Sequence, residues 1–295
     1  MKLPVFTGSG VALATPFTSA GVDFPALKKL VDFQINNGTD AIIVCGTTGE
    51  ATTMTHEEKM QAIETVVEHT NGRVPVIAGS GANSTETAVH SSKEIGKTGV
   101  DGLLVVTPYY NKATPKGLIR HYTAVADAVL KPVILYNVPA RTGVRCTAEV
   151  YAALAKHPNI VGVKEASSDL ALVQRTRRTC PEDFYIWSGD DAETAPIMLL
   201  GGKGVISVAA NIVPRQMHQL TADCLSGNFT AAGAMQLKLS KLMEALFWEV
   251  NPIPVKTALA MMGHCQEILR LPMCEMEPDN RRRLQAVLKE YGLLA

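Results

Sequence analysis

The feature that most constrains the fold is a regular alternation of short apolar runs with longer amphipathic segments. Eight runs rich in Val, Ile and Leu show little polar alternation, which is typical of parallel strands covered on both faces. They span residues 11–15, 41–45, 74–78, 102–107, 132–136, 160–164, 184–187 and 204–208.

The segments between these runs have helical periodicity. Thr55 to Glu58 has the spacing of a capping box, and the periodic stretch that follows it ends at Asn71-Gly72. Similar segments cover residues 26–35, 86–95, 118–129, 148–155 and 170–178. Eight strands alternating with helices favour an α/β fold of the (β/α)8 TIM barrel type over a doubly wound sheet.

Strand patterns stop at about residue 213. Helical patterns then cover residues 216–225, 230–247, 255–269 and 279–291. One of these helices completes the last strand–helix unit, and the others form a C-terminal helical extension. We therefore predict a barrel over residues 1–226 and a C-terminal helical region over residues 227–295 that packs on the barrel.

Composition excludes several classes of function. The 28 basic and 28 acidic side chains give no net charge, so nothing favours binding to nucleic acid or to an anionic membrane. No apolar run approaches the roughly 20 residues of a membrane helix. The beginning of the chain lacks the apolar core of a signal peptide. The six cysteines form no C-x-x-C pair. A cytoplasmic protein without a zinc site or disulfide framework is expected.

Barrel enzymes carry their chemistry at the carboxyl ends of the strands. Polar or reactive residues follow the predicted strands at Gly46–Glu50, Thr107–Asn111, Tyr136–Gly143, Lys164 and Ser188–Asp191. All seven histidines lie in predicted helices or at helix ends, which disfavours a metal cluster or a Ser-His-Asp triad at this rim. Asp190 and Asp191 are interpreted as an N-cap and a first-turn charge, in preference to a cation site.

The turn Gly46–Glu50 has two readings. Its glycines allow backbone N–H groups to approach an anion such as a carboxylate, or its threonines act as local caps of a tight turn. The phenols of Tyr109, Tyr110 and Tyr136 are either ordinary packing residues or a proton relay. Arg141 either binds a carboxylate or is solvated.

Lys164 is unusual because it ends an apolar strand. Alternation places Gly162 on the same face, where it leaves room for a long side chain or a ligand beside the amine. Glu165 faces the other way and is a poor partner. Lys164 is therefore either a strand-end charge that reaches solvent or a distant carboxylate, or a reactive amine. Removal from water favours the neutral amine that Schiff-base chemistry requires.

Taken together, these motifs resemble the dihydrodipicolinate synthase family, which belongs to a superfamily that includes N-acetylneuraminate lyase and other pyruvate aldolases. The resemblance covers essentially the whole chain, in family order. Thr47-Thr48 together with Arg141 favours the synthase, because the sialate lyases usually have Ser-Thr in this turn and lack the arginine. The motifs span residues 46–50, 107–110, 136–139, 141–143, 163–166, 188–191 and 204–208.

The resemblance implies a homotetramer built as a dimer of dimers, which condenses pyruvate with L-aspartate-4-semialdehyde to 4-hydroxy-tetrahydrodipicolinate on the route to diaminopimelate and lysine. It implies no metal and no diffusible cofactor. Lys164 would form an imine with pyruvate. Tyr136 would move protons through the Thr47 hydroxyl to Tyr110, which reaches in from an adjacent subunit.

Further roles implied by the resemblance concern the two substrates. Backbone N–H groups of Thr47 and Thr48 would hold the pyruvate carboxylate. Arg141 would support Tyr136 and bind the carboxylate of the semialdehyde. Gly189 and Ile206 would line the site.

The resemblance also places an effector site for lysine at Ala51, His56, Lys59, Asn83, Thr87 and Tyr109. Lysine-sensitive members tend to have histidine at the position of Lys59 and glutamate at that of Thr87. A fixed ammonium and a missing carboxylate both disfavour a cationic effector. We therefore expect weak or absent inhibition by lysine.

Two alternative functions remain. One is another 2-keto-acid aldolase on the same scaffold, such as N-acetylneuraminate lyase. The other is a barrel that binds a keto acid without catalysis or acts as a regulatory partner; the joint presence of Lys164, Tyr136 and Thr47 argues against it.

Overall fold

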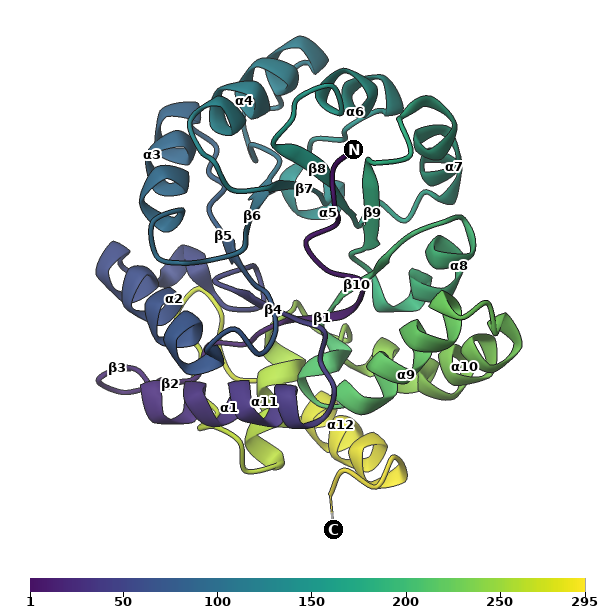
Figure 1. Ribbon diagram of the computed structural model, residues 1–295. Coiled ribbons are helices and arrows are strands. Elements are labelled where there is room, and N and C mark those ends of the chain that lie inside the picture. Colours follow the sequence, from purple (N-terminus) through teal and green to yellow (C-terminus); the bar gives the residue numbers. More distant parts are fainter. Residues whose placement is uncertain (295) are drawn as a thin grey trace.

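The computed structural model describes residues 1–294 and contains a closed barrel of parallel strands (Figure 1). Around the barrel the strands follow the order β1-β10-β9-β8-β7-β6-β5-β4. This confirms the predicted (β/α)8 architecture. The strands are β1 Gly8–Ala12, β4 Ala41–Val44, β5 Val76–Gly79, β6 Gly102–Val106, β7 Val133–Asn137, β8 Ile160–Glu165, β9 Tyr185–Ser188 and β10 Gly204–Ser207; β2 Phe17–Thr18 and β3 Gly21–Val22 pair separately as a small antiparallel sheet.

The first strand differs most from its prediction over residues 11–15. It begins at Gly8 and ends at Ala12. Beyond that point the backbone N–H of Ala14 donates to the side chain of Asn211 at 3.0 Å, and no longer to a neighbouring strand. The apolar run therefore continues past the end of the strand.

Helices surround the barrel on its outer face (Figure 1). The predicted capping box is present, because the Thr55 side chain accepts from the Glu58 N–H and the Glu58 carboxylate accepts from the Thr55 N–H. That helix ends at Asn71, which has a φ of 48°. The helices are α1 Phe24–Asn36, α2 His56–Thr70, α3 Thr85–Ile95, α4 Pro115–Asp127, α5 Pro139–Thr142, α6 Ala148–Leu154, α7 Leu170–Thr179, α8 Thr194–Leu199, α9 Pro214–Leu225, α10 Phe229–Ala245, α11 Ile253–Met261 and α12 Pro278–Glu290; short 3₁₀ turns occupy Ala51–Thr53, Asp191–Glu193 and Ala209–Asn211.

The N-terminal segment closes one end of the barrel. It runs across the barrel opening in Figure 1. The ring of Phe6 stacks on that of Trp187 with centroids 5.4 Å apart, and Trp187 Nε1 donates to the Phe6 carbonyl at 3.2 Å. Because Phe6 precedes β1, this plug lies at the amino ends of the strands, and the carboxyl ends are left for a site.

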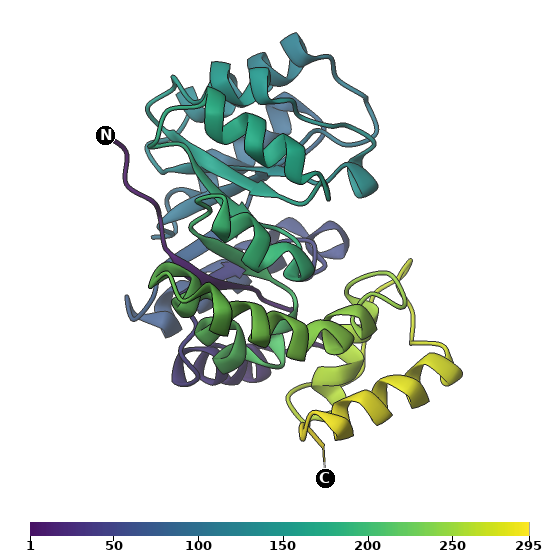
Figure 2. The same cartoon turned by 90° about the vertical axis from the view of Figure 1, so that its right-hand side faces the viewer.

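The last two helices, α11 and α12, lie on the side of the barrel away from the N-terminus (Figure 2). The predicted helix over residues 255–269 is wrong beyond Met261. Gly263 has a φ of 78°, which ends the helical path, and no helix forms again before Pro278. Among the helices described in residues 1–294, none combines the length and the hydrophobicity that a membrane span requires.

A buried ion pair joins this C-terminal part to the turn after β4. Lys256 Nζ lies 2.5 Å from Glu50 Oε1, and neither side chain is more than 2% exposed. The same Nζ donates to the Ile268 carbonyl at 2.6 Å, and the Arg270 N–H donates to Glu50 Oε2 at 3.1 Å. Burial lowers the pKa of Lys256, although Glu50 opposes the change.

A second, more exposed pair lies beside the first. The Arg270 guanidinium donates to both carboxylate oxygens of Glu58, at 2.5 and 2.6 Å. These hydrogen bonds lower the pKa of Glu58 to about 2. The irregular chain after α11 is thereby held against α2 and the β4 turn.

Replacement of Lys256 by methionine tests the buried pair. The Lys256→Met variant leaves Glu50 buried without a cation, and we expect the free energy of unfolding to fall by about 3–5 kcal/mol in urea denaturation. The matched control is Lys241→Met, which removes an ion pair whose two side chains are each 54% exposed, with an expected loss below about 1 kcal/mol.

The double variant Glu50→Gln/Lys256→Met separates charge burial from lost packing. It should recover part of the stability, because no buried charge is left unpaired. Equal stability of wild type, Lys256→Met and the double variant would contradict the ion-pair account.

Candidate active site

Lys164 and Tyr136 face each other across neighbouring strands. β7 and β8 pair in parallel with Tyr136 opposite Lys164. Lys164 Nζ lies 4.3 Å from the centroid of the phenol ring. Lys164 is 5% exposed and Tyr136 6%. Within residues 1–294 no carboxylate forms an ion pair with this amine, and little of the side chain reaches solvent.

Glu165, the last residue of β8, forms hydrogen bonds on the outer face of the barrel. Its Oε1 accepts from Asn137 Nδ2 at 2.8 Å and from the Ser167 N–H at 3.0 Å, and its Oε2 accepts from the Tyr151 hydroxyl at 2.7 Å. Burial raises its pKa. Glu165 therefore faces away from Lys164, as predicted, and its partners hold β8 in place.

The room beside the amine does not come from Gly162, and that prediction is wrong. A Cβ on Gly162 would lie 2.0 Å from the Tyr185 carbonyl oxygen, so this glycine allows β9 to approach β8 closely. A Cβ on Gly189 would instead lie 3.0 Å from Cγ and Cε of Lys164 and 2.7 Å from Ala166 Cβ. Gly189 is the residue that leaves space for the lysine.

The turn after β4 has the features of an anion site. Within residues 1–294 the backbone N–H groups of Thr47 and Thr48 donate to no protein acceptor. The two hydroxyls do not cap the turn; Thr48 Oγ1 instead accepts from Asn251 Nδ2 at 3.0 Å. Gly49 is held by its carbonyl, which accepts from Thr15 Oγ1 at 2.8 Å. The geometry therefore favours the carboxylate reading over the local-cap reading.

A cavity of about 500 Å³ connects part of the predicted catalytic set with most of the predicted effector set. Thr47 and Tyr136 line it. So do five predicted effector residues: Ala51, His56, Lys59, Thr87 and Tyr109. Asn83 does not, and its carbonyl accepts from Asn111 Nδ2 at 2.8 Å. The lining contains no aspartate or glutamate.

The remaining predicted site residues lie outside that lining. Ile206 is fully buried in the barrel interior. Arg141 is exposed on α5, and its Nη2 donates to the Asn251 carbonyl at 3.0 Å. Tyr110 is 87% exposed with a φ of 73°. Within residues 1–294 no hydrogen bond links the hydroxyls of Tyr136, Thr47 and Tyr110.

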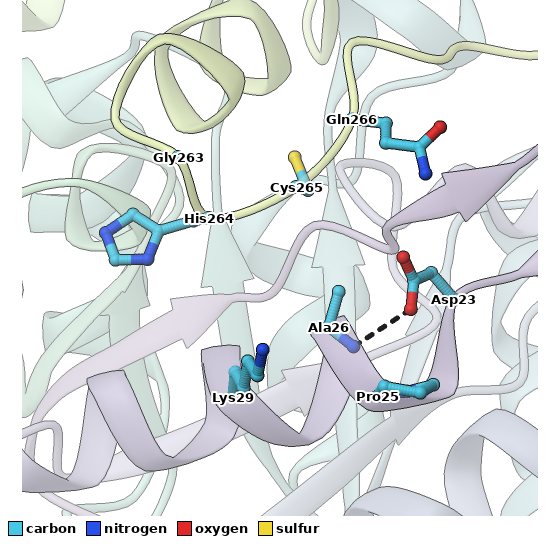
Figure 3. Close-up of a pocket in the computed structure, with 8 residues that line it drawn as sticks. All are labelled: Asp23, Pro25, Ala26, Lys29, Gly263, His264, Cys265 and Gln266. Carbon is cyan, nitrogen blue, oxygen red and sulfur yellow. Dashed lines mark hydrogen bonds between the residues drawn. The ribbon is translucent and has the colours of Figure 1, made fainter.

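A second cavity, of about 280 Å³, lies between the first turn of α1 and the chain that follows α11 (Figure 3). The Asp23 carboxylate there accepts from the Ala26 N–H at 3.0 Å, which is a helix cap. None of the predicted site residues lines this cavity. Among the described residues, no group of three or more His, Cys, Asp or Glu side chains is placed to hold a metal ion.

The two aspartates after β9 differ from each other. Asp190 caps the following turn, because its Oδ1 accepts from the Ala192 N–H at 3.0 Å, and this confirms the predicted cap. Asp191 lies in the first turn as predicted, but its carboxylate is buried. It accepts from the N–H groups of Val208 and Ala209 at 3.0 and 2.8 Å. Burial raises its pKa, and the residue ties β9 to the end of β10.

Sequence reasoning missed the residues that hold the site from the C-terminal part. Lys256 carries the one charge in the mostly apolar stretch 253–260, and that contrast could have identified it. Asn251 gives no comparable signal, because its partners Thr48 and Arg141 are far away in sequence.

A closed barrel whose strand ends carry one buried amine against a phenol, beside a turn with free N–H groups, has the construction of a Schiff-base aldolase. The chain matches the dihydrodipicolinate synthetase family over residues 5–291. It therefore belongs to that family.

Individual relatives agree. A 4-hydroxy-tetrahydrodipicolinate synthase from Thermoanaerobacter sp. (strain X514) is 53% identical over 293 residues, which is 99% of each chain. The dihydrodipicolinate synthase structure from Aquifex aeolicus is 47% identical with a TM-score of 0.96, covering 98% of this chain and 99% of that one. The chloride-inhibited enzyme from Acinetobacter baumannii, solved in complex with pyruvate, is 42% identical with a TM-score of 0.96 and the same coverage. These relatives support the predicted synthase over the alternative of a sialate lyase.

A methyl group at position 189 tests the space beside Lys164. Gly189→Ala should lower stability by about 1–3 kcal/mol through overpacking and reduce turnover in a coupled synthase assay, because the lysine must shift. Gly233→Ala is the control, since its Cβ would meet no atom within 4 Å and alanine favours the helix. Equal behaviour of the two variants would remove the assigned role of Gly189.

Proposed function

We propose that this chain condenses pyruvate with L-aspartate-4-semialdehyde to give 4-hydroxy-tetrahydrodipicolinate, on the route to diaminopimelate and lysine. One observation carries the proposal. The buried amine of Lys164 lies against the Tyr136 phenol without a carboxylate partner among residues 1–294. An amine held in such a place is positioned to act as a nucleophile toward a carbonyl carbon.

Lys164 Nζ attacks the C2 carbonyl of pyruvate, and loss of water leaves the imine. The imine withdraws electrons from C3, which loses a proton and becomes an enamine carbon. That carbon attacks the aldehyde of the semialdehyde. The amino group of the semialdehyde then attacks C2, which closes the ring and releases Lys164. Each proton must pass between substrate and protein, and Tyr136 is the phenol beside the amine.

The roles of the other residues follow from their positions. The free N–H groups of Thr47 and Thr48 hold the pyruvate carboxylate. Arg141 binds the carboxylate of the semialdehyde by charge-assisted hydrogen bonds. Gly189 provides space for the lysine, and Ile206 forms an apolar wall.

We propose that the proton relay is completed in an oligomer. Tyr110 is 87% exposed. Within residues 1–294 its hydroxyl forms no hydrogen bond with the hydroxyl of Thr47 or of Tyr136. Its position fits a side chain that reaches the Thr47 hydroxyl of a second copy. A tetramer built as a dimer of dimers satisfies this need. The zero net charge gives no support for a nucleic-acid partner, and we propose that the enzyme is cytoplasmic.

Borohydride trapping tests the Schiff base. Incubation with pyruvate and borohydride should leave a stable adduct on Lys164, located by peptide mass mapping. Lys164→Arg should abolish trapping and leave the fold intact, because a guanidinium keeps its charge and is a poor nucleophile. Lys203→Arg is the control, at the opposite ends of the strands. An adduct elsewhere, or none, would refute the mechanism.

Inhibition by L-lysine tests the effector prediction. We expect no inhibition at low micromolar concentration, because Lys59 lines the cavity and no carboxylate does. The double variant Lys59→His/Thr87→Glu replaces the repulsive group and supplies an acidic one, and it should gain sensitivity. A low-micromolar inhibition constant for the wild type in steady-state assays would overturn the prediction.

A further inference from the structure

Asn251 contacts two groups that the proposed function uses for different substrates. It lies between α10 and α11 and is 5% exposed. Its side-chain Nδ2 donates to Thr48 Oγ1 at 3.0 Å. Its backbone carbonyl accepts from Arg141 Nη2 at 3.0 Å. One residue therefore links the turn for the keto-acid carboxylate to the guanidinium for the second carboxylate.

The segment around Asn251 is anchored on both sides, so the link is rigid. On the C-terminal side, Lys256 pairs with Glu50, which belongs to the same turn as Thr48. On the N-terminal side, Glu249 Oε1 accepts from Asn280 Nδ2 of α12 at 2.9 Å. A displacement of Asn251 would therefore have to break contacts with both the turn and the C-terminal helices.

The amide is not explained by stability alone. With Nδ2 on Thr48, the Oδ1 of Asn251 is buried and has no hydrogen-bond partner among residues 1–294. An unpaired buried carbonyl is destabilising, and an apolar residue at this position would avoid that penalty. The hydrogen bond to Thr48 is then what the amide contributes, in a residue whose backbone carbonyl also holds Arg141.

We propose that Asn251 is a positioning residue that fixes the spacing between Thr48 and Arg141, and thereby selects an aldehyde that carries a carboxylate at the matching distance. This inference rests on the proposed function. Within residues 1–294 no hydrogen bond joins Asn251 to Lys164. Imine formation at saturating pyruvate therefore does not depend on Asn251. Its effect lies in substrate binding and in the choice of aldehyde.

Steady-state kinetics of Asn251→Ala and Asn251→Leu test the proposal. Both variants lose the hydrogen bond to Thr48, and leucine keeps the approximate side-chain size if the alanine variant fails to fold. We expect KM for the semialdehyde to rise about tenfold, because misplacement of a binding group weakens orientation. Preference for the semialdehyde over an uncharged aldehyde such as propionaldehyde should fall, while borohydride trapping at saturating pyruvate stays at the wild-type level.

Two controls complete the test. Asn37→Ala removes an amide whose Nδ2 donates to the Phe33 carbonyl at 2.8 Å, away from the site, and its KM values and preference should match the wild type. A cycle with Thr48→Val should be non-additive, since both changes delete one hydrogen bond. Wild-type KM and preference in both Asn251 variants, or fully additive effects, would overturn the inference. Absence of trapping and turnover in the wild type would instead refute the proposed function.

Discussion

The parallel register between β7 and β8 determines where chemistry can occur in this molecule. It places Tyr136 opposite Lys164, with the amine 4.3 Å from the ring centroid. On the other side of β8, Lys164 pairs in register with Trp187 of β9. The ring of Trp187 stacks on Phe6 of the N-terminal segment, which closes the opposite end of the barrel. A shift of one residue would turn the lysine to the outer face, where Glu165 now lies. The hydrogen bonds of Glu165 to Asn137 and Tyr151 oppose that shift.

The other half of the site depends on the C-terminal part of the chain. The β4 turn contains Glu50 in the left-handed region at a φ of 52°, a conformation that costs of order 1 kcal/mol or more in a residue other than glycine. Lys256 and the Arg270 N–H hold its carboxylate there, and Asn251 holds Thr48. Helices that follow the barrel in sequence therefore shape the first turn of the active site, and the N–H groups of Thr47 and Thr48 are left free for an anion.

The sequence predicted the parts of the molecule that local patterns encode. Continuous apolar runs identified all eight barrel strands, and barrel closure then placed Lys164 and Tyr136 at one rim. Gly162 and Gly189 could not be told apart by alternation, because the difference lies in which neighbouring atom a Cβ would meet. The end of α11 at Met261 was missed because the residues beyond it are held by Glu50 and Glu58 and not by their own periodicity. The role of Asn251 was missed because its partners Thr48 and Arg141 are far away in sequence.

A crystal structure of the enzyme soaked with pyruvate shows whether Lys164 forms the imine. Continuous electron density is expected from Lys164 Nζ to C2 of the keto acid, with the carboxylate on the N–H groups of Thr47 and Thr48. Density that ends at a free Lys164 amine, or a carboxylate bound elsewhere, would contradict the proposed mechanism.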